Sequence, residues 1–307
     1  MAHIYVYSPS GAVVDKAGFR RGLAWLKQQG HAVEVDPNAL TVHQRFAGDD
    51  DTRLAAIERA ALSGADLCLP TRGGYGITRL VHRLPLKAIE RSLANGCQWM
   101  GFSDFTAWHC GVWQGLGQGS WAGLHLIADL GAESPDDITT ACFDDVLNRA
   151  SEGTGWRLKR FDHPQDTPQD QQLAKGGVLW GGNLAVLTSL QGSPHFPRIK
   201  RGVLFLEDVG EHPYRVERLM LQLLHSGVLD AQQLIVMGQF NQYQLVPFDR
   251  GFNLKRVVQW LRTQTRTPIV CGLPFGHVPT KVCLPFGQKV DVMVQGNEAL
   301  MLWGSMH

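Results

Sequence analysis

The first half of the chain alternates between short apolar runs and longer segments with helical spacing. The run "HIYVYSP" is rich in β-branched and aromatic residues and stops at Pro9, whereas "DKAGFRRGLAWLKQQG" spaces its apolar residues for a helix and ends at Gly30. The alternation continues with predicted strands at 31–36, 65–70 and 97–102 and predicted helices at 49–64, 77–84 and 104–116. Short strands that alternate with helices indicate a mainly parallel sheet covered on both faces.

The pattern changes between residues 151 and 175, where "DHPQDTPQDQQLAKG" is polar and contains two prolines. We interpret this region as a linker that carries one strand, between an N-terminal domain at 1–150 and a C-terminal domain at 176–307. The later segments are 177–190 (strand, glycine turn and helix), 201–211, 233–240 and 268–277 (strands), 213–227 and 253–264 (helices) and 281–303 (a small β-region with a period near two). Two α/β domains are therefore expected, and a cleft between domains is a common place for an active site.

Composition narrows the class of function. The 307 residues are 44% apolar and 19% charged, with 29 basic against 28 acidic side chains, so a large core can be buried and no basic tract indicates a nucleic acid or a membrane surface as partner. The N-terminus "MAHIYVYSPSG" lacks the features of a secretory signal, and no window is apolar for long enough to span a membrane. The six cysteines form no CxxC pair, and neither an HExxH motif nor a cluster of metal ligands is present. We therefore expect a cytoplasmic protein with reduced thiols and with no metal or cofactor.

A glycine-rich loop follows the predicted strand at 65–70. In "PTRGGYGITRL", Gly73, Gly74 and Gly76 allow backbone N–H groups to approach a ligand, which predicts an anion or oxyanion cradle. The GxGxxG spacing of a dinucleotide site is absent. A tight turn between strand and helix is the alternative, and the loop by itself does not decide between them.

Ser103 lies between a predicted strand and a predicted helix, in "GFSDFT". A serine at this position can be an exposed nucleophile, next to a helix N-terminus that favours negative charge. It can also be a helix N-cap, for which serine and aspartate are usual choices. Taken alone, the sequence around Ser103 favours the cap.

Two more candidates lie at strand ends. Glu207 closes the apolar strand "VLFLE", where its carboxylate could orient a histidine, while Asp208 and Glu211 are better interpreted as capping acids before the helix at 213–227. His277 lies on a glycine-flanked loop between two β-segments, unlike His109 and others that fall within helical patterns. A serine, an acid and a histidine at three strand ends, in that chain order, match one known ordering of a catalytic triad.

These segments resemble the LD-carboxypeptidase family of serine peptidases, and most closely its murein tetrapeptide type. Each shared motif is weak alone, but together they run in order over nearly the whole chain: "SPSG" at 8–11, "RFAG" at 45–48, "RGGYG" at 72–76, "GFSD" at 101–104, "LWGGNLAVL" at 179–187, "LFLEDVGEHPYRVERLMLQL" at 204–223, "FGH" at 275–277 and "LPFG" at 284–287. Where close relatives read "GPM", this chain has "WAGLHL" at 121–126, a region that can line the substrate pocket.

The resemblance implies a flavodoxin-like N-terminal domain with a parallel sheet, a C-terminal mixed α/β domain with a small β-region, and a homodimer. It also implies a role for each site residue: nucleophile Ser103, acid Glu207, base His277, and oxyanion donors in the N–H groups of Gly74 (or its neighbour Gly73) and Asp104.

Further residues are candidates for substrate binding: Gly73, Tyr75, Trp180 and Arg72. A guanidinium grips a carboxylate in bidentate fashion, so Arg72 or Arg79 could hold the terminal carboxylate of a peptide. Arg72 could equally form a salt bridge, and Trp180 could equally belong to the apolar core.

The implied reaction is hydrolysis of the bond between the L-centre of meso-diaminopimelate and a terminal D-Ala, in a muropeptide tetrapeptide used in cell-wall recycling. One alternative is a microcin-immunity-type peptidase or amidase of the same superfamily, which would keep the triad and change the pocket. The other is a non-catalytic α/β module whose glycine loops bind an anion.

Overall fold

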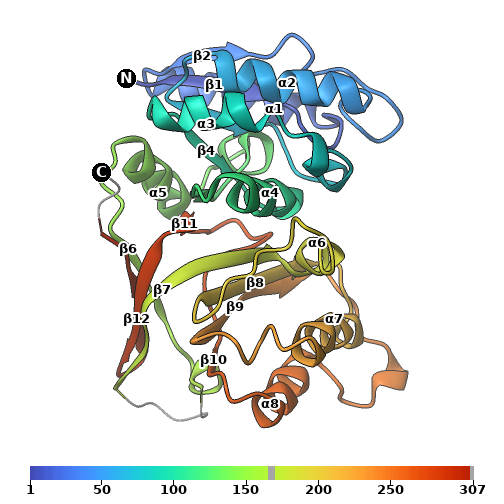
Figure 1. Cartoon of the computed structure of the whole chain (residues 1–307), viewed down its shortest axis with the longest axis vertical. Coiled ribbons are helices and arrows are strands. Elements are labelled where there is room, and N and C mark those ends of the chain that lie inside the picture. The colour runs from blue at the N-terminus through green and yellow to red at the C-terminus, as the bar shows by residue number, and fades with distance from the viewer. Residues whose placement is uncertain (165–169, 305–307) are drawn as a thin grey trace. The chain divides into compact units, whose positions relative to one another are not determined.

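The computed structural model describes residues 1–164 and 170–304, which form two compact units (Figure 1). Unit 1 consists of Met1–Ser151 with two later returns of the chain, Leu190–Pro197 and Pro279–Pro285. Unit 2 consists of the remaining segments from Glu152 onward. Each unit contains its own β-sheet with helices, which confirms the α/β class and the two-domain organisation.

The sheet of unit 1 has the strand order β2-β1-β3-β4-β5-β11. Its strands are β1 (His3–Tyr7), β2 (Ala32–Val35), β3 (Leu67–Pro70), β4 (Gln98–Gly101), β5 (Ser120–Ala122) and β11 (Leu284–Phe286). All neighbouring pairs from β2 to β5 are parallel. The order 2-1-3-4-5 is that of flavodoxin-like folds, so the predicted type of N-terminal domain is confirmed.

The helices of unit 1 begin at the caps that the sequence suggests, with Asp15 and Asp49 accepting backbone N–H groups of the next turn. The α-helices are α1 (Lys16–Gln28), α2 (Asp50–Leu62), α3 (Leu86–Ala94), α4 (Thr106–Leu116) and α5 (Asp137–Leu147). The helix predicted at 77–84 is instead two successive 3₁₀ turns, which share Leu80 as a cap residue. A segment this short gains little from helix propagation, so local turns prevail.

The sheet of unit 2 is mixed, with the order β10-β9-β8-β7-β12-β13-β6. Its strands are β6 (Gly153–Arg157), β7 (Gln171–Asn183), β8 (Val203–Val209), β9 (Leu234–Asn241), β10 (Ile269–Val270), β12 (Lys289–Gln295) and β13 (Glu298–Leu302). The strands from β7 to β10 are parallel, whereas β12 and β13 pair in antiparallel fashion. The helices are α6 (Leu184–Ser189), α7 (Pro213–His225) and α8 (Leu254–Gln264).

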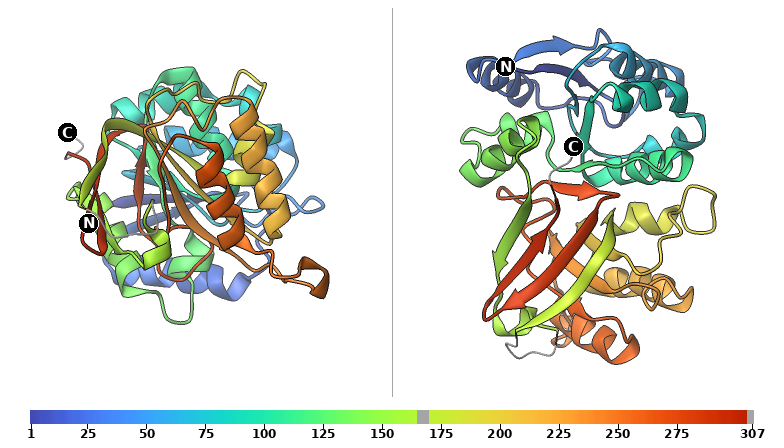
Figure 2. Two further views of the ribbon diagram at one scale, coloured as in Figure 1. Left: turned by 90° about the horizontal axis from the view of Figure 1, so that it is seen from below. Right: turned by 60° about the vertical axis from the view of Figure 1, so that its left-hand side comes forward.

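The long strand β7 joins the two halves of this sheet, running beside β12 (Figure 2). Its first part pairs with β12 and its last part pairs with β8. The region at 151–175, which the sequence presents as a linker, contributes β6 and the first residues of β7 to the sheet, and its residues 165–169 lie outside the described ranges.

Candidate active site

Three loops of unit 1 follow parallel strands and therefore leave the sheet at the same edge. Residues 8–11 follow β1, residues 71–76 follow β3, and Ser103 follows the end of β4. In sheets of this order, ligands bind beyond the carboxyl ends of the strands, at the switch point between β1 and β3. The motifs "SPSG" and "RGGYG" lie on either side of that point.

Ser103 has a backbone conformation that residues with side chains seldom adopt. Its φ is 61°, in the left-handed region, which costs about 1–2 kcal/mol relative to the right-handed one. Such strain persists only where the surroundings enforce it, and it is concentrated at functional sites. The turn connects β4 to a 3₁₀ turn at Ser103–Phe105 and then to α4, as in a nucleophile elbow. The cap interpretation is not supported, because the cap positions are Phe102 and Phe105 and neither has a side-chain capping bond.

Gly73 of the glycine loop lies against the Ser103 side chain. A Cβ atom at Gly73 would be 3.1 Å from Ser103 Oγ and 2.9 Å from His125 Cε1. The Gly73 carbonyl accepts a hydrogen bond from the Gly11 N–H at 3.3 Å. Because the C=O and N–H of a trans peptide point in opposite directions, the Gly74 N–H points away from Gly11. This orientation, together with a φ of 122° at Gly74, is compatible with the predicted oxyanion donor.

The Asp104 side chain connects the loops around Ser103. It is fully buried, and its Oδ2 accepts hydrogen bonds from Ser10 Oγ at 2.5 Å and from the Ile77 N–H at 3.0 Å. Burial raises the pKa of Asp104, and the bond from Ser10 opposes that rise. The carboxyl group therefore ties the "SPSG" motif and the glycine loop to the turn, while the Asp104 backbone N–H remains the predicted second oxyanion donor.

The predicted substrate-binding side chains of the glycine loop differ in their surroundings. Tyr75 is 46% exposed and is available to a ligand. Arg72 donates to the Ala12 carbonyl at 3.2 Å, which anchors its guanidinium beside the loop after β1. Arg79 forms an ion pair with Asp50 at 2.9 Å, so it is already engaged with another carboxylate.

Trp180 is fully buried in β7. Its indole Nε1 donates to Gln232 Oε1 at 3.0 Å, which satisfies the polar atom of the ring. This environment is the one expected for the core alternative, and a stacking role would require the surrounding side chains to move.

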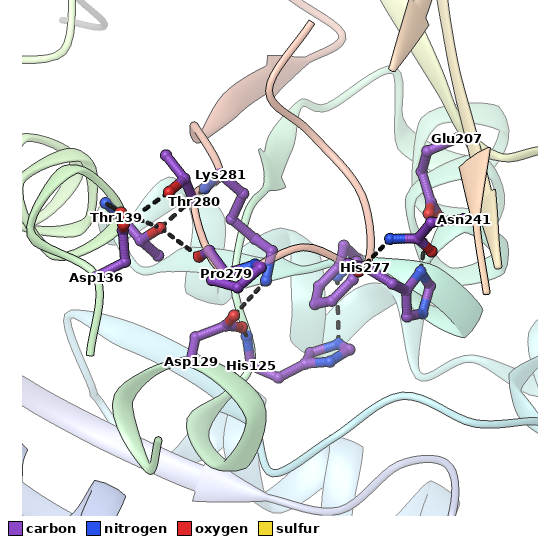
Figure 3. A network of polar contacts seen from close by, with 11 residues as sticks. His125, Asp129, Asp136, Thr139, Glu207, Asn241, His277, Pro279, Thr280 and Lys281 are labelled. Atoms are coloured by element: carbon purple, nitrogen blue, oxygen red, sulfur yellow. Dashed lines mark hydrogen bonds and ion pairs between the residues drawn. The ribbon is translucent and has the colours of Figure 1, made fainter. Parts of the chain in front are cut away.

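Unit 2 contains the predicted acid and base in direct contact. Glu207 Oε2 and His277 Nδ1 are 2.8 Å apart (Figure 3). Glu207 is fully buried, whereas the His277 side chain is 22% exposed. Because a carboxylate accepts the hydrogen bond, Nδ1 carries the proton and Nε2 of the neutral ring is the basic nitrogen. A buried carboxylate that orients an imidazole in this way resembles the acid–base pair of serine hydrolases.

Two amide side chains that the sequence analysis missed hold this pair. Asn183 Nδ2 donates to Glu207 Oε1 at 3.1 Å, and Asn241 Nδ2 donates to the His277 backbone oxygen at 2.7 Å. Asn183 ends β7 directly opposite Glu207 in the parallel register. An asparagine after two glycines at a strand end was the available signal for Asn183, whereas nothing in the sequence singles out Asn241.

Asp208 caps a different helix from the one expected. It accepts hydrogen bonds from the Ala185 N–H at 2.9 Å and from Asn183 Nδ2 at 3.0 Å, at the start of α6. The prediction that it caps the helix at 213–227 is wrong, because β8 directs the carboxylate toward α6 and the N-cap of α7 is His212. Burial raises the pKa of Asp208 to about 6, and the neighbouring Glu207 charge adds to the rise.

Three wider features bear on the chemistry. Within residues 1–164 and 170–304, no group of three or more His, Cys, Asp or Glu residues could hold a metal ion. In the same ranges, no helix is long and apolar enough to cross a membrane. The six cysteines are free thiols.

Both halves of the chain match one known family. Residues 4–123 match the LD-carboxypeptidase N-terminal domain, and residues 176–292 match the LD-carboxypeptidase C-terminal domain. A Streptomyces coelicolor protein named "putative carboxypeptidase" is 32% identical over 301 residues, covering 95% of this chain and 90% of the relative. The "probable murein peptide carboxypeptidase" of Bacillus subtilis is 26% identical over 273 residues, covering 87% and 81%. The crystal structure of muramoyltetrapeptide carboxypeptidase from Oxalobacter formigenes is similar with a TM-score of 0.86 and 34% identity, over 98% of each chain.

Proposed function

Since the chain belongs to the LD-carboxypeptidase family, we propose that it hydrolyses the LD-peptide bond between meso-diaminopimelate and the terminal D-Ala of murein tetrapeptides. The observation that carries the proposal is the contact of 2.8 Å between the buried Glu207 carboxylate and His277, which prepares a base for acyl transfer. The murein names of two similar proteins support a muropeptide as the substrate. The proposed setting is cell-wall recycling in the cytoplasm, by a homodimer.

The proposed mechanism uses Ser103, Glu207 and His277 as a catalytic triad. His277 Nε2 accepts the Ser103 proton while Oγ attacks the carbonyl carbon of the LD bond. Glu207 holds the ring and stabilises the imidazolium that forms. His277 then protonates the amine of the departing D-Ala as the C–N bond breaks, and water hydrolyses the resulting acyl-enzyme with the same residue as base.

The proposed oxyanion donors are the N–H groups of Gly74 and Asp104. Donors fixed in advance stabilise the charge that develops on the carbonyl oxygen, and loss of one donor costs ~10²–10³ in kcat. The strained turn at Ser103 supports this role for Asp104, because it starts a helical turn whose first N–H groups have no partners within the helix.

A substrate panel with the purified protein tests the reaction. We expect mass spectrometry to detect release of D-Ala alone from L-Ala–γ-D-Glu–meso-diaminopimelate–D-Ala. We expect no cleavage of the D-Ala–D-Ala bond of the pentapeptide. Cleavage of an aminoacyl sulfamoyl adenosine, with no D-Ala released from the tetrapeptide, would favour the immunity-type peptidase. Binding of an anion without any hydrolysis would favour the non-catalytic module. Analytical ultracentrifugation of the same preparation tests the homodimer.

The roles within the triad have their own kinetic test. Glu207→Gln should lower kcat by roughly 10⁴, because the wrong tautomer of His277 is then stabilised, while KM changes little. A Glu207→Gln variant with near-normal kcat would remove Glu207 from the mechanism.

A further inference from the structure

Two buried histidines bind the peptide group that directly precedes the turn at Ser103. His109 Nε2 lies 3.0 Å from the Gly101 carbonyl oxygen, and His125 Nε2 lies 3.3 Å from the Phe102 backbone nitrogen. The Gly101 carbonyl and the Phe102 N–H belong to one peptide group, so both of its polar ends are bound by an imidazole. Because these ends point in opposite directions, the two rings lie at opposite edges of the peptide plane.

The two rings use the same nitrogen in opposite ways. A carbonyl oxygen only accepts, so His109 Nε2 must donate, and Nδ1 of the neutral ring then accepts from the Ser120 hydroxyl at 2.7 Å. A backbone N–H only donates, so His125 Nε2 must accept, and the proton of the neutral ring is on Nδ1. The peptide group therefore requires one specific tautomer of each histidine.

His125 is itself fixed by a buried ion pair. Its backbone N–H donates to Asp129 Oδ2 at 2.7 Å, and Asp129 Oδ1 pairs with Lys281 (Figure 3). Both partners of the pair are almost fully buried. The His125 ring stacks on the Phe102 ring with 4.2 Å between centroids, and Lys281 Nζ lies 4.6 Å from the centroid of that same ring. Contacts of this kind leave the imidazole little freedom to rotate.

These contacts converge on the backbone that leads into the turn at Ser103. Ser103 is held at a φ of 61°, and the residue two positions earlier, Gly101, has its carbonyl bound by His109 and also by the Gly123 N–H at 3.1 Å. On the other side, the His125 ring lies beside Gly73, which in turn lies beside Ser103 Oγ. A displacement of about 1 Å at a reacting group can cost ~10² in rate.

We propose that His109 and His125 are positioning residues for Ser103, acting through the Gly101–Phe102 peptide group. The inference rests on the proposed role of Ser103 as nucleophile and adds residues that act on it from within unit 1.

The test measures Ser103 reactivity with a fluorophosphonate probe, which needs no muropeptide. His125→Leu removes the acceptor and His109→Leu removes the donor, and each should lower the second-order rate of Ser103 labelling by ~10–100-fold. Glutamine offers Oε1 as acceptor or Nε2 as donor near the position of the imidazole Nε2, so His125→Gln and His109→Gln should label within about fivefold of the wild type. With the tetrapeptide, the leucine variants should lose kcat and keep KM.

The matched control is Ser92→Ala. Ser92 is buried in the same unit and accepts a hydrogen bond from Trp99 Nε1 at 3.0 Å, so its loss should lower Tm without changing the labelling rate. Ser120→Ala is a milder variant that keeps His109 but removes the hydroxyl that donates to its Nδ1, and it should slow labelling about tenfold even if a leucine variant does not fold.

The possible outcomes separate the two proposals. Leucine variants that fold and label at the wild-type rate would overturn the positioning role and leave the triad untouched. The positioning role would also be overturned if Ser92→Ala, at the same loss of Tm, lost as much labelling as the leucine variants. It would likewise be overturned if the glutamine variants folded but were labelled as slowly as the leucine variants. If the wild type is not labelled at Ser103, both the proposed function and the positioning role fail.

Discussion

His109 provides a prediction whose size follows from its surroundings. Its ring is fully buried in α4, and burial lowers its pKa from 6.5 to about 4, while the bond to the Gly101 carbonyl opposes the shift. The folded protein therefore holds His109 neutral, whereas the unfolded chain takes up the proton once the pH falls below 6.5. The stability that depends on this residue is complete above pH 6.5 and is lost as the pH falls through 4.

The magnitude follows from the two pKa values. At about 1.4 kcal/mol per pH unit, the full effect is about 3 kcal/mol, of which about 2 kcal/mol is lost between pH 8 and pH 5. Urea denaturation followed by tryptophan fluorescence at both pH values gives the wild-type change. His109→Gln keeps a neutral donor for the Gly101 carbonyl and does not titrate. Between pH 8 and pH 5, its free energy of unfolding should therefore fall by about 2 kcal/mol less than the free energy of unfolding of the wild type.

Ser92→Ala provides the control for this experiment, because it removes a buried hydrogen bond of unit 1 without removing a titrating group. It should shift stability by the same amount at both pH values. If His109→Gln loses as much stability as the wild type between pH 8 and pH 5, the buried neutral imidazole is not the cause and the reasoning is refuted.

The other predictions concern strain and buried charge. Ser103→Gly and Ser103→Ala should both abolish hydrolysis. In urea denaturation the glycine variant should be about 1 kcal/mol more stable than the alanine variant, because glycine adopts a φ of 61° without strain. Equal stabilities of the two variants would contradict the strained turn. Lys281→Met leaves the Asp129 carboxylate buried without its charge partner and should lower the free energy of unfolding by about 3–5 kcal/mol. Adding Asp129→Leu should recover part of that loss, and a double variant less stable than Lys281→Met would contradict the prediction. Because folding raises the pKa of Asp208 from 3.8 to about 6, the protonated form is favoured and its stabilisation is lost as the pH rises through 6. Between pH 4 and pH 8, the free energy of unfolding of the wild type should therefore fall by about 2 kcal/mol relative to that of Asp208→Asn. If urea denaturation gives the same difference between the two proteins at both pH values, the raised pKa of Asp208 is contradicted.

Much of the fold follows from periodicity, and two of the strands lack a pattern that would predict them in full. Up to α2, the helices have clear caps, and the strands alternate with the helices along the chain. This alternation of strands and helices predicts that the strands are parallel. β5 has only three residues, too few for a pattern, and β7 begins inside a polar, proline-containing region because its first part pairs with β12. Pairing with a distant strand overrides local composition in such a segment.

The candidate site shows the same division between local and distant information. Ser103, Glu207 and His277 could be proposed because the motifs around them run in family order along the chain, although the sequence around Ser103 alone favours a helix cap. The supporting residues could not, because their roles depend on segments that meet only in the fold: His125 reaches Phe102 from 23 positions away, and Asn183 meets Glu207 only through strand pairing. His109 was interpreted as a structural histidine of a helix, and its bond to Gly101 places that structural role two residues before Ser103, the proposed nucleophile.

The most direct measurement of the central claim combines D-Ala release with the identity of the acylated residue. The protein is mixed with the tetrapeptide, quenched in acid within milliseconds, digested and analysed by mass spectrometry. We predict D-Ala release by the wild type, a tripeptide acyl group on the peptide that contains Ser103, and neither product with Ser103→Ala. Release of D-Ala by Ser103→Ala at the wild-type rate, or an acyl group on a different residue, would contradict the assignment of Ser103 as the nucleophile.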